Sequence, residues 1–170
     1  MVIGVTGTKG KTSVTELLSA IFEEAGHSTA LLNSIQVKIG KAREENTLRM
    51  SMPGRFFIQS FLDDAVRANC TVAILEMTTE GARQSRHRFI ALDGLIFTNI
   101  EPEHIESHGS FQAYADAKFK LARELLRSPK RSRVVVANAD DKESGRYLML
   151  PVEHSLPFSL ETNKPYEAGV

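Results

Sequence analysis

The stretch Gly7-Thr8-Lys9-Gly10-Lys11-Thr12-Ser13 lies between an apolar run at residues 2–5 and a helix-like run at residues 14–22. A strand, a glycine-containing turn and a helix in this order form a phosphate cradle, because the glycines let successive backbone N–H groups point inward. The N-terminus of the helix adds a partial positive charge. Lys11 can reach the outer phosphates, and the Thr12 hydroxyl can bind Mg²⁺. The stretch therefore predicts a phosphate-binding loop.

The match to the general phosphate-loop pattern is incomplete. That pattern requires a glycine five positions before Gly10, and Val5 occupies this position. The order of strand, turn and helix still agrees with the pattern. The alternative interpretation is a Gly/Lys turn in which Thr12 or Ser13 caps the following helix.

The composition is that of an ordinary globular protein, with 170 residues of which 42% are hydrophobic and 25% are charged. Lys plus Arg and Asp plus Glu number 21 each, so no overall basic field favours nucleic acid as a partner. The single cysteine, Cys70, cannot form an internal disulfide or a multi-thiolate metal site. We find no leader and no apolar stretch near the roughly 18 residues of a membrane span. We therefore expect a cytoplasmic protein with no membrane partner.

Short apolar runs alternate with amphipathic segments along the chain. Strands are predicted at residues 1–5, 29–32, 72–75, 94–97 and 134–137, and helices at 12–25, 56–69 and 111–126. Residues 37–39 and 48–51 suggest a hairpin with a polar tip at Gly40-Lys41. The pattern weakens after Leu150, and residues 161–170 resemble a frayed end or a truncation. The expected fold is α/β and P-loop-containing, with a mostly parallel sheet and helices on both faces.

Polar groups follow the predicted strands: the cradle, Glu76, Asn99 and Asn138. Ligands of parallel sheets bind at the carboxyl ends of the strands, so these groups predict one shared site. Glu76 is expected near Thr12, as the second protein ligand of a nucleotide-bound magnesium. The alternative is a strand-end carboxylate that faces water.

Lys118 lies near the centre of the apolar face of the helix predicted at residues 111–126. A lysine at such a position extends its amine to water, pairs, loses its proton or is modified, and the pattern alone favours the first. A desolvated amine could react with carbon dioxide to form a carbamate, which is a metal ligand.

One loop after a strand gathers two histidines and three glutamates. This composition suits divalent metal binding or proton transfer, although such a loop is more often solvated surface. The residues are Glu101, Glu103, His104, Glu106 and His108.

Five motifs, in order along the chain, resemble the central ATP-binding domain of the Mur ligase family. The resemblance is greatest to the MurE type. Folylpolyglutamate synthetase is a relative of this family. They lie at residues 7–12, 76–81, 98–109, 114–118 and 138–141. The family uses a shorter glycine spacing, Gly-Thr-Asn-Gly-Lys-Thr, which explains the incomplete match of the loop.

The resemblance implies a role for each matched residue. Residues 7–13 would bind the phosphates of ATP, with Lys11, His104 and Lys118 catalytic. Thr12 and Glu76 would hold one magnesium, and His104 with a carbamylated Lys118 would hold a second. The nucleoside would lie by Asn138 and Asp140. Contacts to a muramoyl-peptide substrate would come from Ser51, Thr78, Gln84 and Arg86.

Four positions depart from the family pattern: Lys9 replaces Asn, Met52 replaces Thr, Glu80 replaces His and Glu103 replaces Asp. The changes at Met52 and Glu80 affect the implied substrate contacts most. The implied phosphate and metal residues are unchanged.

The implied reaction is ATP-dependent amide formation in peptidoglycan precursor synthesis, through an acyl phosphate. Full enzymes of the family also have an N-terminal uridine-binding domain and a C-terminal amino-acid-binding domain. Neither is expected in residues 1–170, so we interpret the chain as a central domain, incomplete at its C-terminal end, that binds ATP weakly and does not ligate alone. The alternative is a nucleotide-binding module without ligase activity. A P-loop kinase or GTPase would not explain the buried lysine or the histidine loop.

Overall fold

The computed structural model describes residues 1–102 and 109–161. The strands are β1 (Val2–Thr6), β2 (Thr29–Leu32), β3 (Gln36–Ile39), β4 (Ala42–Glu45), β5 (Val72–Met77), β6 (Gly94–Phe97), β7 (Val134–Asn138) and β8 (His154–Phe158). The helices are α1 (Lys11–Glu24), α2 (Arg55–Arg67), α3 (Thr79–Arg83), α5 (Phe111–Arg127) and α6 (Ser144–Leu148).

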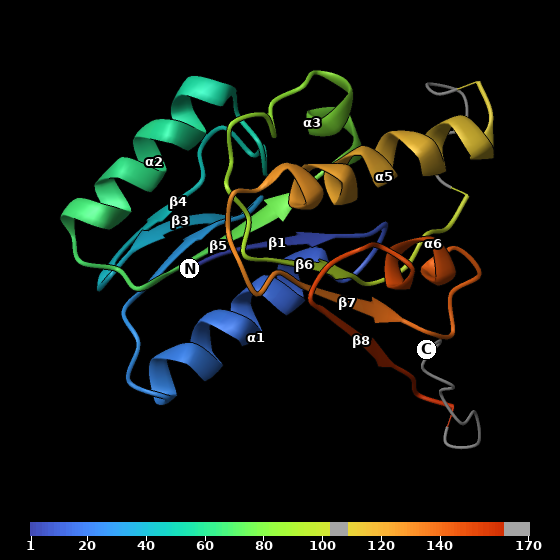
Figure 1. Cartoon of the computed structure of the whole chain (residues 1–170). Helices are drawn as coiled ribbons and strands as arrows, with labels where there is room; N and C mark the ends of the chain where they lie inside the picture. The colour runs from blue at the N-terminus through green and yellow to red at the C-terminus, as the bar shows by residue number, and fades with distance from the viewer. Residues whose placement is uncertain (103–108, 162–170) are drawn as a thin grey trace.

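The described strands form one sheet in the order β4-β3-β2-β5-β1-β6-β7-β8. From β2 to β8 every neighbouring pair is parallel, whereas β3 and β4 add an antiparallel edge. Helix α1 lies on one face of the sheet and α2 and α5 lie on the other (Figure 1). The predicted α/β class, with a mostly parallel sheet and helices on both faces, is confirmed.

The central strands are apolar throughout because both of their faces are covered. In β5, Val72 and Ile74 pack towards the α1 side, whereas Leu75 and Met77 pack into the larger cluster on the other face. Glu76 follows this alternation onto the α1 face. The alternation therefore directs its carboxylate towards the helix that begins directly after the phosphate loop.

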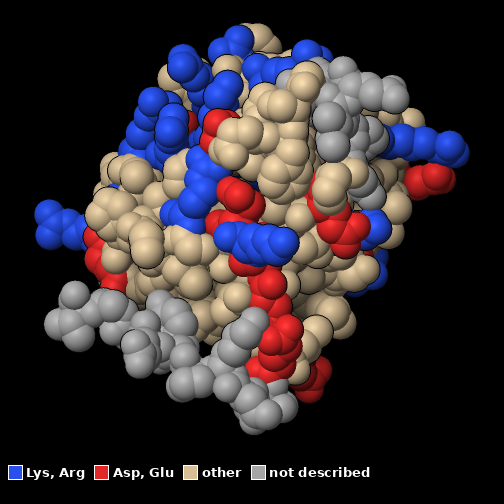
Figure 2. Space-filling model, turned by 90° about the vertical axis from the view of Figure 1, so that its right-hand side faces the viewer, with Lys and Arg blue, Asp and Glu red and all other residues tan. Residues whose placement is uncertain are grey.

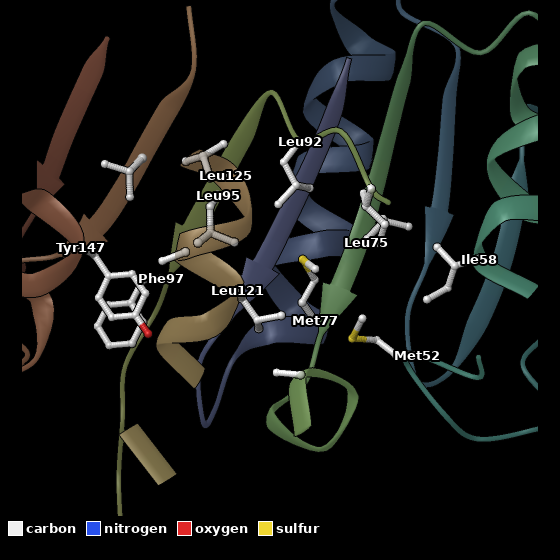
Figure 3. Packing of buried hydrophobic residues seen from close by; sticks show 14 of the residues in the cluster. Met52, Ile58, Leu75, Met77, Leu92, Leu95, Phe97, Leu121, Leu125 and Tyr147 are labelled. Carbon is white, nitrogen blue, oxygen red and sulfur yellow. The ribbon is translucent and has the colours of Figure 1, made fainter. Parts of the chain in front are cut away.

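The larger core cluster lies under α2, α5 and α6 (Figure 3). Leu121 and Leu125 of α5 are fully buried there, and each such side chain contributes about 2 kcal/mol of apolar burial. The ring of Tyr147 stacks on Phe97 with centroids 4.0 Å apart. This packing fixes α5 over β6, and with it the position of the buried Lys118.

The predicted hairpin exists, but its second strand was placed wrongly. The chain reverses at Gly40, which has a left-handed backbone (φ 58°), and β4 follows immediately instead of at residues 48–51. All four residues of β4 are exposed, so the strand has no apolar alternation. The elements α3, α6 and β8 were also not predicted. Each has only five residues, which is too short for a hydrophobic pattern to be recognised.

The face that carries α6 and β8 has acidic and basic side chains side by side (Figure 2). Arg146 of α6 pairs with Asp116 at 2.6 Å and with Glu143 at 3.0 Å. Among the described helices, none is both long enough and apolar enough to cross a membrane.

Candidate phosphate and metal site

The backbone of the phosphate loop depends on two glycines. Gly7 has a φ of 154°, and a Cβ there would lie 1.8 Å from the hydroxyl oxygen of Thr98. Gly10 has a φ of 78° and precedes the first turn of α1, with no side-chain cap. The carbonyl of Gly10 accepts from the N–H of Val14 at 2.9 Å. The alternative interpretation, a turn capped by Thr12 or Ser13, is therefore wrong.

The loop is anchored to the chain that follows β6. The N–H of Thr8 donates to the carbonyl of Asn99 at 2.9 Å, and the N–H of Lys9 donates to the Asn99 side chain at 2.9 Å. The Thr98 hydroxyl donates to the Lys9 carbonyl at 2.8 Å. Within the loop, the amine of Lys11 donates to the Thr8 carbonyl at 2.8 Å. The hydrogen bonds to Thr98 and Asn99 thus fix the backbone conformation of the loop.

Glu76 and Thr12 meet at the carboxyl end of β5. The Thr12 hydroxyl donates to Glu76 Oε2 at 2.9 Å, and Glu76 is only 4% exposed. The alternative of a carboxylate that faces water is therefore wrong. A hydroxyl beside a buried carboxylate is a donor set of the kind that Mg²⁺ prefers, so these residues fit a magnesium ion.

Ser34 belongs to the same group and was missed in the sequence. Its N–H donates to Glu76 Oε2 at 3.2 Å, and its hydroxyl lies 3.3 Å from the Thr12 hydroxyl. Ser34 comes just after β2, at the same sheet edge. Extending the search for polar groups at strand ends to this strand would have found it.

Lys118 reaches the phosphate loop from α5. It is 1% exposed, its amine donates to the Gly7 carbonyl at 2.8 Å, and it lies 5.0 Å from the centroid of the Tyr114 ring. The amine therefore does not extend to water, and the favoured alternative from the sequence is wrong. His104, the predicted partner of Lys118 at a second metal, lies outside the described residues, as do Glu103, Glu106 and His108.

Tyr114 is a second residue without a sequence-assigned role. Its hydroxyl lies 3.1 Å from the Thr8 hydroxyl, which also accepts from the N–H of Glu101 at 3.0 Å. These contacts connect α5, the phosphate loop and the segment after β6.

Across the described residues, no three His, Cys, Asp or Glu side chains form a ready-made metal cluster.

The residues predicted near the nucleoside, Asn138 and Asp140, lie at the end of β7 and just after it. Asp140 accepts from the N–H of Leu160 at 2.8 Å, and the Asn138 side chain accepts from the N–H of Asp140 at 3.1 Å. A cavity of about 450 Å³ opens beside Asp140. The cavity is lined by Ile100, Pro102, Phe111, Asp140, Asp141, Lys142 and Glu143. Because Asp141 also accepts from the N–H of Ile100 at 2.6 Å, the cavity adjoins the segment that holds the phosphate loop.

The four residues predicted to contact substrate lie together around α3. The Thr78 hydroxyl caps this helix, and Gln84 accepts from Arg86 at 2.5 Å. Arg86 also donates to the carbonyl of Met52, next to the buried Ser51. This group lies beyond the end of β5, at the same sheet edge as the phosphate loop.

Met52 and Glu80, the two departures near the substrate residues, both have structural contacts. Met52 is 3% exposed, and its sulfur would lie 2.3 Å from a Cβ at Gly81. Glu80 accepts two hydrogen bonds from Arg83, each 2.9 Å long. These hydrogen bonds lower the pKa of Glu80. Met52 is thus a core residue, and Glu80 is paired with the next turn of its own helix.

These features define a class of protein: an α/β domain with a glycine-containing loop between strand and helix, a buried glutamate and a buried lysine gathered at one edge of a mostly parallel sheet. The profile of the Mur ligase middle domain matches residues 5–166. The chain therefore belongs to the Mur ligase family.

Individual relatives agree with this assignment. The chain is 29% identical over 166 residues to the UDP-N-acetylmuramoyl-L-alanyl-D-glutamate--2,6-diaminopimelate ligase of Halalkalibacterium halodurans, covering 98% of the chain and 34% of the relative. It is 35% identical over 155 residues to the UDP-N-acetylmuramyl-tripeptide synthetase of Roseiflexus sp., covering 86% of the chain and 30% of the relative. The chain thus spans about a third of the length of the curated relatives it matches.

Solved structures share the fold. A UDP-N-acetylmuramoyl-L-alanyl-D-glutamate--2,6-diaminopimelate ligase matches 95% of the chain and 32% of its own length, with a TM-score of 0.81 and 24% identity. The MurF ligase of Thermotoga maritima, solved in complex with ADP, matches 95% of the chain and 33% of its own length, with a TM-score of 0.58 and 21% identity.

Proposed function

We propose that this chain is the ATP-binding central domain of an amide-forming ligase of peptidoglycan precursor synthesis. The observation that carries the proposal is the meeting of Lys11, Thr12, Glu76 and Lys118 around one loop. Elements far apart in sequence place two amines, a hydroxyl and a buried carboxylate at the carboxyl edge of the sheet. This is where ligands of parallel α/β domains bind.

The phosphate loop would hold the triphosphate through its inward N–H groups and Lys11. Thr12 and Glu76 would hold magnesium, which when bound neutralises charge on the transferring phosphoryl group. Lys118 and His104 would hold a second magnesium, with Lys118 as its carbamate. Asn138 and Asp140 would lie by the nucleoside, beside the cavity described above.

The reaction begins when a substrate carboxylate attacks the γ-phosphate of ATP, giving an acyl phosphate and ADP. An incoming amine then displaces phosphate and forms the amide. Lys11 stabilises the charge that develops during the first transfer. Ser51, Thr78, Gln84 and Arg86 would position the carboxylate of a UDP-muramoyl peptide. A cytoplasmic location remains an expectation that accompanies this function.

The second candidate is a nucleotide-binding module that does not ligate. It is favoured by Met52 and Glu80, whose side chains are occupied by core packing and by Arg83. Both candidates require nucleotide binding, and they differ in whether amide formation follows. We expect the isolated chain to bind ATP weakly and not to ligate.

Calorimetric titration with a non-hydrolysable ATP analogue, with and without Mg²⁺, tests the shared requirement. We expect binding that depends on Mg²⁺ and weakens about 30- to 100-fold in Lys11→Ala, the range for a lost charge-assisted hydrogen bond. Binding unaffected by Mg²⁺ and by Lys11→Ala would contradict the proposal.

A phosphate-release assay with a UDP-muramoyl dipeptide and a diamino acid separates the two candidates when it is run on a full-length chain that carries this domain. Robust amide formation by the isolated chain would show that our expectation of inactivity is wrong. A crystal structure with the analogue and Mg²⁺ would test the carbamate, through density beyond the amine of Lys118.

A further inference from the structure

Lys9 and Glu101 form an ion pair at the mouth of the phosphate loop. The amine of Lys9 lies 2.6 Å from Glu101 Oε2, and their side chains are 60% and 49% exposed. The pair joins the loop to the segment after β6.

The backbones of both partners are fixed. The N–H of Lys9 donates to the Asn99 side chain, its carbonyl accepts from the Thr98 hydroxyl, and the N–H of Glu101 donates to the Thr8 hydroxyl. Only the two side chains are therefore left to rearrange. An exchange of partners by Lys9 would not require the loop to change shape.

The amines of Lys11 and Lys118 contact backbone carbonyls of the loop, those of Thr8 and Gly7. The amine of Lys9 contacts a carboxylate, an anion that a phosphate group can replace. An exposed ion pair is weak and easily broken, whereas a triphosphate offers several charged oxygens as acceptors.

We propose that Glu101 competes with the nucleotide phosphates for Lys9, so that the ion pair acts as a latch that nucleotide binding opens. The inference rests on the proposed function, because it requires a phosphate-bearing ligand in the loop. Beyond the phosphate-binding role already expected of residues 7–13, it assigns a phosphate contact to the side-chain amine of Lys9 and makes Glu101 the group that competes for this amine.

The test compares Lys9→Gln, Glu101→Gln and the double variant by calorimetric titration with the ATP analogue and Mg²⁺. Lys9→Gln should weaken binding about three- to tenfold and Glu101→Gln should tighten it about two- to fivefold, the range for exposed charge interactions. The double variant should bind like Lys9→Gln, because removing the competitor matters only when Lys9 is present. Lys41→Gln and Glu44→Gln, on the exposed β3–β4 hairpin, are the matched controls.

The outcomes separate this inference from the proposed function. If the wild-type chain binds but Glu101→Gln is unchanged or weaker, the pair only braces the loop and the inference is overturned. If Lys9→Gln binds normally, Lys9 is not a phosphate contact and the inference is equally overturned. If the wild-type chain does not bind at all, the proposed function falls and takes the inference with it. Circular dichroism melts of each variant confirm folding.

Discussion

The phosphate loop (residues 7–13) and the α3 segment (residues 78–87, with Met52 packed against it) lie at the same edge of the sheet, but their contacts are of different kinds. At the loop, Lys118 reaches Gly7 from 111 residues away, and Thr12 reaches Glu76 from 64 residues away. At α3, Glu80 bonds Arg83 within the same helix, in exposed positions. The first region is therefore held by buried contacts between distant elements, and the second mostly by local ones.

This difference separates the two halves of the proposed site. In the phosphate region, Lys11, Thr12, Glu76 and Lys118 match the family pattern, and their polar atoms contact the loop or one another. In the α3 region, the two departures, Met52 and Glu80, are occupied by packing and by an ion pair. We therefore expect substitutions near the loop to change nucleotide binding, and substitutions near α3 to change stability with little effect on nucleotide.

The largest effect is expected for Lys118→Met. This change removes the amine that bonds the Gly7 carbonyl and leaves that buried acceptor without this donor. We expect the affinity for the Mg²⁺-bound ATP analogue to fall about 30- to 100-fold, as when a charged hydrogen-bond partner is lost. Lys120→Met, on the exposed side of the same helix, should stay within about twofold. If the two variants bind the analogue equally well, Lys118 is not part of the nucleotide site.

Gly81→Ala tests the packing of the α3 region. The new Cβ would lie 2.3 Å from the Met52 sulfur and 3.0 Å from the Met52 Cβ, so we expect a loss of about 1–2 kcal/mol of unfolding free energy in urea titration. Nucleotide affinity should not change. In the background of Met52→Ala the contacts with the sulfur and Cγ are removed and only the 3.0 Å contact with the Cβ of residue 52 remains, so Gly81→Ala should then cost clearly less. A loss of equal size in both backgrounds would contradict the clash.

The pH dependence of stability tests the contact between the α3 segment and α5. His87 is 4% exposed, and its Nε2 lies 3.7 Å from Glu124 Oε2. Burial lowers the pKa of His87, although Glu124 opposes this. The unfolded chain then binds a proton that the folded chain does not. Stability should therefore fall as the pH drops below about 6.5, by about 1 kcal/mol at pH 5.5.

The variant His87→Gln should lose this pH-dependent part between pH 7.5 and 5.5, whatever its absolute stability. His27→Gln, at an exposed histidine, should keep the wild-type slope. Urea titrations at several pH values measure both. If the unfolding free energy of His87→Gln depends on pH as strongly as that of the wild-type chain, groups other than His87 cause the dependence.

Long, strongly patterned segments were predictable from the sequence, and polar or brief ones were not. Continuous apolar runs indicated the buried strands β1, β5 and β7, because only strands covered on both faces have that pattern. The exposed strand β4 has no such signal, and the hairpin was placed wrongly as a result.

The candidate site follows the same rule. The contact of Glu76 with Thr12 was predictable because topology brings strand ends together. The contact of Lys118 with the Gly7 carbonyl was not predictable, because nothing in a residue's identity reveals which backbone carbonyl a distant amine will meet. Ser34 was overlooked because the search for polar groups at strand ends did not include β2, and Tyr114 was matched to a motif without a role because its hydrogen-bond partner, Thr8, lies on a distant segment.

The smallest effect is expected for Glu80→Ala, the change that bears most directly on the comparison. Glu80 and Arg83 are both exposed and adjacent on one helix, where ion pairs contribute little. We expect the melting temperature to move by less than about 2 °C and nucleotide affinity not to change. The Gln84 side chain donates to Glu80 and accepts from Arg86. In a full-length enzyme that carries this domain, Glu80→Ala would therefore free Gln84 and loosen Arg86, so KM for the muramoyl-peptide should shift while KM for ATP does not. A parallel shift in both constants would mean that the α3 segment and the phosphate loop act as one unit.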